Sequence, residues 1–179
     1  APARVDLTLE PGGPRVILSG QVVWRRAGDD GRDPAGCTVG LGPSERYKIN
    51  FINGFVRGGL INRRERRRLP LRLPVTYGAI DGPQQTFTRD VNEEGLFIMT
   101  GSPMPERTTL HLLLGVPGQA QPLSLKATVV HTVVVEDEDI PGMGVRFILA
   151  TDEEKHFMRT VDELEAAFYK GSLPDEIIS

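Results

Sequence analysis

Apolar and polar residues alternate along most of this chain with the period of two that is typical of β-strands. The expected strands are 4–9, 15–26, 36–41, 69–75, 86–89, 96–99, 109–114, 123–135 and 144–149. The fourth of these carries Pro70 and Pro74 on one face, which favours an edge strand or a strand at the mouth of a barrel. Glycine, proline and acidic residues between the strands predict turns and polar hairpin loops.

Two segments have helical spacing instead. The first begins near Ser44, which we expect to act as its cap, and ends before Gly58. The second begins at Thr151 and Glu154, which form a capping-box pattern, and ends at Gly171. Its apolar face is formed by Phe157, Met158, Val161, Leu164 and Phe168. Residues 172–179 are expected to be a tail.

The first sixty residues resemble the last seventy in pattern. Val22 and Val129 align at an offset of 107 residues (129 − 22), and Val16 and Leu18 align with apolar residues at the same offset. A glycine-rich strand and an amphipathic helix follow in both copies. Such repeats indicate duplicated units. The first copy therefore looks like the back half of a module whose front half is absent, although a separate small β domain is the alternative.

Composition and charge narrow the functional classes. Apolar residues make up 39% and charged residues 25% of the chain, which is ordinary for a soluble globular protein. The formal net charge is −3, so general binding of nucleic acid is not expected. The sequence contains neither a phosphate-binding Gly-Lys-Ser/Thr loop nor a Gly-x-Ser-x-Gly elbow, and its three histidines lack metal-type spacing. We therefore expect a protein that is not an enzyme and holds no metal or cofactor.

Other features concern the compartment. The single cysteine, Cys37, excludes an internal disulfide and is expected to be a small buried residue, as suits the cytoplasm. No apolar run approaches the roughly 20 residues that span a bilayer. The chain begins at Ala1 without methionine, so we expect a fragment or a trimmed form.

The strongest local feature is a run of arginines. Six of the eleven residues from Asn62 to Arg72 are arginine, in a chain that is otherwise acidic. A guanidinium group donates two parallel hydrogen bonds to phosphate oxygens and stacks on flat purine rings. Arg64 and Arg68 project together if the run forms a helical turn. A compact ligand with several phosphates and purines would fit, whereas a solvated basic linker is the alternative.

A second stretch, Asp90–Gly95, favours the ligand. Asp90 ends a strand, and carboxylate and amide groups such as those of Asp90 and Asn92 form hydrogen bonds with base edges. Gly95 permits a positive φ, which would turn the loop back toward a ligand. An Asx turn between two strands is the alternative interpretation of the same residues.

Together the two stretches resemble the PilZ domain family. The resemblance rests on Arg64-x-x-x-Arg68, on Asp90-Val91-Asn92-Glu93-Glu94-Gly95, and on the strand Gly144-Val145-Arg146-Phe147 before a helix, and it covers about residues 61–170. It implies an all-β protein with flanking helices: a six-stranded antiparallel barrel with a C-terminal helix. The implied domains are a partial or degenerate PilZ-like module over 1–60, the barrel with its helix over 61–171, and the tail.

The resemblance implies cyclic di-GMP as the ligand. Arg64 and Arg68 match the arginine motif of the family and Arg63 matches the residue that often precedes it, although Arg63 with Arg67 also has the required spacing. Asp90, Asn92 and Gly95 match the turn motif, with Asn92 in place of the usual serine. Arg67 and Arg146 are additional candidates.

The implied function is that of a cytoplasmic receptor. Ligand binding would rearrange the arginine segment and change contacts with an effector protein, and homodimer formation is left open. One alternative is a degenerate interaction module that does not bind nucleotide. A weaker alternative is binding of RNA or DNA by the arginine run, which the acidic remainder of the chain argues against.

Overall fold

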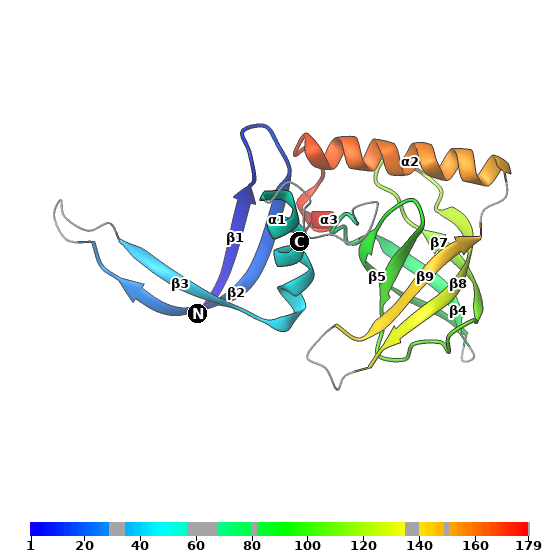
Figure 1. The fold of residues 1–179 in the computed structure, drawn as a ribbon, viewed down its shortest axis with the longest axis horizontal. Helices are drawn as coiled ribbons and strands as arrows, with labels where there is room; N and C mark the ends of the chain where they lie inside the picture. The colour runs from blue at the N-terminus through cyan, green and yellow to red at the C-terminus, as the bar shows by residue number, and fades with distance from the viewer. Residues whose placement is uncertain (29–34, 57–67, 80–81, 135–139, 149–150, 179) are drawn as a thin grey trace.

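The computed structural model describes residues 1–28, 35–56, 68–79, 82–134, 140–148 and 151–178. The side chains of Thr151 and Glu154, and with them the expected capping box, lie outside the described residues, as do Gly58 and Gly59. Figure 1 shows an open sheet at one end of the molecule, a barrel at the other, and a long helix that reaches from one to the other. None of the described helices is long and apolar enough to cross a membrane.

The N-terminal module consists of a small antiparallel sheet and one helix. Its strands are β1 (Pro2–Thr8), β2 (Arg15–Arg26) and β3 (Gly36–Leu41), in that order. A short 3-10 helix, η1 (Pro43–Glu45), leads into α1 (Arg46–Val56). Gly42 is the N-cap of η1 and makes no side-chain cap hydrogen bond, so the predicted cap at Ser44 was wrong, because Ser44 lies inside η1.

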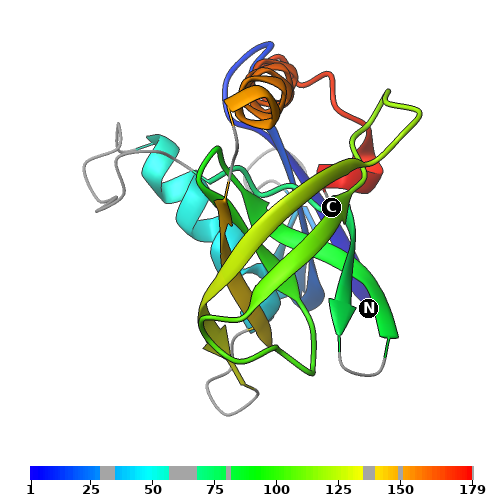
Figure 2. The same cartoon turned by 90° about the vertical axis from the view of Figure 1, so that its right-hand side faces the viewer.

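The second part is a closed six-stranded antiparallel barrel, as the resemblance implied. Its strands are β4 (Pro74–Ala79), β5 (Gly82–Val91), β6 (Gly95–Met99), β7 (Thr109–Leu114), β8 (Leu123–Val133) and β9 (Gly142–Ile148). The order around the barrel is β4-β5-β6-β9-β8-β7, and β4 closes it by pairing with β7. Figure 2 looks at this end of the molecule.

One predicted strand differs. Leu69, Leu71 and Leu73 are buried, as the alternation predicted, but β4 begins only at Pro74 and is not an edge, because it pairs with both β5 and β7. The stretch before it makes a single bridge, between Leu69 and Val91. Proline lacks a backbone N–H, so Pro70 cannot donate to a strand ladder.

The pairing of the strands confirms the internal repeat. Val22 lies opposite Val39 in the N-terminal sheet, and Val129 lies opposite Val145 in the barrel. β2 has a register shift between Val22 and Trp24, and β8 has one between Val129 and His131, at the same offset. β1 pairs with β2 in the register in which β7 pairs with β8. The open sheet therefore repeats the β7-β8-β9 half of the barrel.

Cys37 is exposed, so the predicted burial was wrong. It lies on β3, which is an edge of the open sheet among the described residues. The matching residue of β9 is Met143, which is fully buried, because β9 also pairs with β6. The same place in the repeat is therefore covered in one copy and uncovered in the other.

Helix α2 (Thr151–Tyr169) connects the two parts. Phe157 packs edge-on against Phe147 of the barrel, with ring centroids 4.5 Å apart, and Phe168 packs against Phe51 of α1 at 5.3 Å. The helix ends at Tyr169, and the predicted terminating glycine, Gly171, follows with a φ of 62°. The N–H groups of Gly171 and Ser172 donate to Phe168 and Ala167, which is a Schellman motif.

The segment expected to be a tail instead packs into the molecule. It contains the short helix α3 (Asp175–Ile178), and the side chains of Leu173, Ile177 and Ile178 are buried in the main apolar cluster. Asp175 forms ion pairs with Arg4 at 2.7 Å and Arg15 at 3.2 Å, both from the N-terminal sheet. The carbonyl of Ile177 accepts a hydrogen bond from the N–H of Arg72. α3 therefore contacts the open sheet and the segment that enters the barrel.

Candidate functional site

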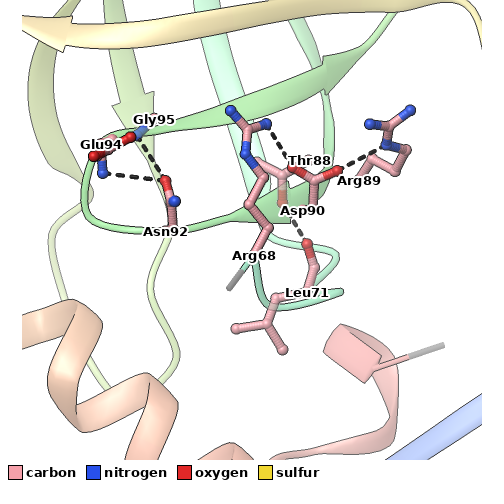
Figure 3. A network of polar contacts seen from close by, with 8 residues as sticks. All are labelled: Arg68, Leu71, Thr88, Arg89, Asp90, Asn92, Glu94 and Gly95. Atoms are coloured by element: carbon pink, nitrogen blue, oxygen red, sulfur yellow. Dashed lines mark hydrogen bonds and ion pairs between the residues drawn. The ribbon is translucent and has the colours of Figure 1, made fainter. Parts of the chain in front are cut away.

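The turn between β5 and β6 is shaped by one side chain. Oδ1 of Asn92 accepts hydrogen bonds from the backbone N–H groups of Glu94 and Gly95, both at 3.1 Å (Figure 3). The backbone N–H of Asn92 in turn donates to the carbonyl of Gly95 at 3.0 Å. Asn92 is 3% exposed, so this arrangement is an Asx turn held from within. The side-chain oxygen of Asn92 therefore serves the turn.

Asp90 lies next to this turn and is held from two sides. Its Oδ1 accepts from Nη1 of Arg68 and its Oδ2 from Nε of Arg89, each at 2.8 Å. Figure 3 shows the two guanidinium groups on opposite sides of the carboxylate. The side chains of Arg68, Arg89 and Asp90 are 17%, 12% and 7% exposed, so water screens these pairs less than it screens surface pairs. Two guanidinium groups thus share one carboxylate.

A β-bulge explains how neighbouring residues meet in this way. Side chains of consecutive strand residues normally point to opposite faces. The pairing of β5 with β6 shifts between Thr88 and Asp90, which leaves Arg89 as the extra residue. Bulges re-aim side chains and are frequent next to functional sites. Here the bulge brings Arg89 and Asp90 to the same side.

The backbone that carries Arg68 is fixed to β5. Leu69 and Val91 exchange two backbone hydrogen bonds, at 2.8 and 3.0 Å. The buried hydroxyl of Thr88 donates to the carbonyl of Leu71 at 2.6 Å and accepts from the N–H of Leu73 at 2.9 Å. Arg68 therefore leaves a well-anchored segment. Its Nε is buried without a hydrogen-bond partner, the only such side-chain atom in the described part of the chain.

Gly95 is required for a reason other than the one predicted. The described glycines with positive φ are Gly12, Gly82, Gly118 and Gly171, so the expectation of a positive φ at Gly95 was wrong. Gly95 is the first residue of β6, and a Cβ atom added there would overlap the carbonyl oxygen of Val145 on β9. The absence of a side chain lets the end of the turn approach β9.

The residues named from the sequence separate into three groups. Arg68, Asp90, Asn92 and Gly95 come together at the β5–β6 turn. Arg63, Arg64 and Arg67 lie outside the described residues. Arg146 lies opposite Gly95 on β9 and is exposed. It lines a pocket of about 290 Å³ with Glu93, Glu94 and Phe147.

Two residues of this region, Arg89 and Tyr47, were given no role from the sequence. Cζ of Arg89 lies 3.8 Å from the ring centroid of Phe97 on β6 and 5.8 Å from that of Tyr47 on α1. Burial raises the pKa of the Tyr47 hydroxyl, and the carboxylate of Glu45 adds to the effect. The signal for Arg89 was its position next to Asp90. No local signal could reveal Tyr47, because it comes from a different module.

Comparison with known proteins identifies the barrel. A family model described as PilZ domain matches residues 62–164. The chain is similar to the solved PilZ domain of CeSA from a cellulose-synthesizing bacterium, with 21% identity, a TM-score of 0.44, and coverage of 56% of this chain and 99% of that chain. A search of curated proteins found no match.

Two further solved structures are similar. The PilZ domain of YcgR from Escherichia coli, determined with c-di-GMP, is 15% identical with a TM-score of 0.45, covering 59% of this chain and 93% of that chain. The inhibitor of motility MotI/DgrA from Bacillus subtilis is 12% identical with a TM-score of 0.48, covering 91% and 72%.

Proposed function

Because the chain belongs to the PilZ domain family, a family of cyclic di-GMP receptors, we propose that it binds cyclic di-GMP at the β5–β6 turn. The observation that carries the proposal is the buried carboxylate of Asp90, which holds Arg68 beside the Asx turn of Asn92. This arrangement places a guanidinium fork, a carboxylate and an amide within one small region. Phosphate and guanine together present partners for all three.

Each residue has a role in the proposal. Arg68, with Arg64 and Arg63, binds phosphate and stacks on guanine, as the resemblance to the family implies. Asp90 orients Arg68 and offers its remaining lone pairs to guanine N–H groups. Asn92 holds the turn through its oxygen and offers its amide N–H to the ligand. Arg67 and Arg146 remain additional candidates.

The output in this proposal is a changed contact with an effector protein in the cytoplasm. The arginine segment joins α1 to the barrel in sequence, so a ligand that binds it acts between residues 1–60 and residues 61–171. The first of these is proposed to be a partial PilZ-like module, which is supported by the repeated strand pairing. Its described strands, β1 to β3, include no counterpart of β5 and β6.

Calorimetric titration with cyclic di-GMP tests this function. Binding at micromolar concentration or tighter is expected for the unmodified chain. Arg64→Ala, Arg68→Ala and Asp90→Ala should each weaken it at least about tenfold, equivalent to about 1.4 kcal/mol. Arg159→Ala is the matched control, because Arg159 is exposed on α2. The proposal would be wrong if the unmodified chain gave neither heat of binding nor a shift in melting temperature at high cyclic di-GMP concentration.

A second candidate function is an interaction module that does not bind nucleotide. It is favoured by the engagement of both Asp90 oxygens and of Asn92 Oδ1 within the protein itself. In that case the ion pairs are structural, and binding of a partner protein would be indifferent to cyclic di-GMP. The titration separates the two functions.

A further inference from the structure

We propose that Arg89 is a positioning residue of the ligand site and that Tyr47 couples α1 of the N-terminal module to Arg89. The inference rests on the proposed function, since the site is the one where cyclic di-GMP would bind. Neither residue belongs to the two sequence motifs that point to the ligand.

The first step is the restraint on Arg89. Its Nε donates to Oδ2 of Asp90 at 2.8 Å, and its guanidinium plane lies over the face of Phe97 at 3.8 Å. A guanidinium held by a carboxylate on one edge and an aromatic face below has little freedom to reorient. With 12% of its side chain exposed, Arg89 is better placed to hold Asp90 than to bind a ligand directly.

The second step is the contact with the other module. The ring of Tyr47 lies 5.8 Å from Cζ of Arg89, within the range of a cation–π interaction. Tyr47 belongs to α1, whereas Arg89 and Phe97 belong to the barrel. Arg89 therefore contacts aromatic rings from both parts of the molecule.

The third step is the attachment of α1 to its own sheet. Nζ of Lys48 lies 3.0 Å from Oε2 of Glu45 and donates to the carbonyl of Ile17 on β2 at 2.8 Å. Oε2 of Glu45 also accepts from the N–H of Ser19 at 3.2 Å. Lys48 and Glu45 are buried, and breaking a buried, hydrogen-bonded ion pair is costly. The start of α1 thus moves with β2, and Tyr47 moves with both.

These steps form one series of contacts: Arg68, Asp90, Arg89 and Tyr47. A ligand that binds Arg68 or Asp90 changes the hydrogen bond between Asp90 and Arg89, and this change reaches α1 through Tyr47. Ligand binding at Arg68 or Asp90 is therefore coupled to the position of α1 through Arg89 and Tyr47.

The binding arm of the test uses cyclic di-GMP and calorimetry. Arg89→Gln should raise the dissociation constant about tenfold, and Arg89→Lys by less, because lysine keeps the charge but not the fork or the stacking. Tyr47→Leu should change it no more than threefold. Arg159→Gln is the control. Equal affinity of Arg89→Gln and the unmodified chain would overturn the positioning role.

The coupling arm uses hydrogen exchange of the α1 amides. Addition of cyclic di-GMP should change their exchange at least threefold in the unmodified chain and leave it unchanged in Tyr47→Leu, although that variant still binds. A ligand response of α1 that survives Tyr47→Leu would overturn the role of Tyr47.

A ligand-free arm keeps this inference separate from the proposed function. Arg89→Gln and Tyr47→Leu are each expected to change the equilibrium constant of unfolding in urea by some factor. For the double variant, the factor should differ at least threefold from the product of the two single-variant factors. Independent effects would overturn the coupling. If the unmodified chain binds no cyclic di-GMP, the proposed function and the ligand part of this inference both fail, and the ligand-free arm still decides whether Arg89 couples the modules.

Discussion

The sheet β1-β2-β3 and the strands β7-β8-β9 pair in the same registers and carry a bulge at the same place, but they differ at their edges. In the barrel, β7 pairs with β4 and β9 pairs with β6. In the described N-terminal module, β1 and β3 pair only with β2. The pairing of neighbouring strands is thus the same whether or not the sheet closes.

At β3 and the second half of β2, strand pairing is not accompanied by the burial seen in the barrel, although Val16, Ile17 and Leu18 at the start of β2 are buried. Val145 is 1% exposed in the barrel, whereas Val39, its match in the open sheet, is only partly buried. Trp24 and Val23 on β2 are 53% and 66% exposed. A segment can therefore specify its strand geometry locally, while its contribution to stability depends on strands that lie elsewhere in the sequence.

The largest effect is expected where β9 pairs with β6, because β3, the match of β9, has no such second neighbour among the described strands. Gly95→Ala should destabilise the protein by roughly 3 kcal/mol, because the new Cβ would overlap the backbone of Val145 and push β6 away from β9. Cyclic di-GMP binding should be lost as well. Gly78→Ala in β4 is the control, since a Cβ atom there has open space. Equal urea midpoints for the two variants would contradict the close approach.

The matched valines test burial directly. Val145→Ala should cost about 2 kcal/mol in urea unfolding, since it removes buried methyl groups and leaves a cavity. Val39→Ala should cost less than about 1 kcal/mol, because Val39 is partly exposed already. If the two variants lost the same free energy of unfolding, the greater burial of Val145 in the barrel would contribute nothing to stability.

The burial of Tyr47 between α1 and the barrel should make the stability of the protein depend on pH in alkaline solution. The pKa of Tyr47 is raised from its ordinary value of 10.0, so above that pH the unfolded chain releases the phenolic proton while the folded chain retains it. Ionisation of Tyr47 should therefore leave the free energy of unfolding unchanged below about pH 10. Above that pH it should lower the free energy of unfolding by at most about 1.4 kcal/mol per pH unit. Urea unfolding of Tyr47→Phe from pH 8 to 11 should show a smaller decline. An identical decline would place the cause elsewhere.

The smallest effect is expected for the ion pairs between α3 and the open sheet. Asp175→Asn removes ion pairs to Arg4 and Arg15 that are largely solvated, so a loss of thermal stability should be slight and should disappear at high salt. Asp162→Asn on the exposed face of α2 is the control. A large, salt-independent loss would mean that Asp175 has a role besides these pairs.

Much of the fold followed from periodicity. The bounds of β2, β3 and β7 agree with the predicted strands, because alternation is a local property of the sequence. The exceptions depend on distant partners. Cys37 is exposed because β3 lacks an outer neighbour among the described strands, and Ile177 and Ile178 are buried because α3 packs against β2 and the start of the barrel.

The candidate site was found in part for similar reasons. Asp90 and Asn92 lie within five residues of Gly95, so their proximity could be expected from the motif. The bulge at Arg89 and its contact with Tyr47 could not, since both depend on how β5 meets β6 and α1. The Asx turn of Asn92 was one of the two interpretations that the sequence allowed, whereas the role of Gly95 became clear only from backbone geometry.

The exposed thiol of Cys37 has a practical consequence. It is the only cysteine of the sequence, so a maleimide dye or a spin label would attach at one defined place in the unaltered protein. That place is on the open sheet, at a strand that the barrel does not cover. With a second label introduced on the exposed face of α2, spectroscopic distances would follow the two modules in solution as a nucleotide is added.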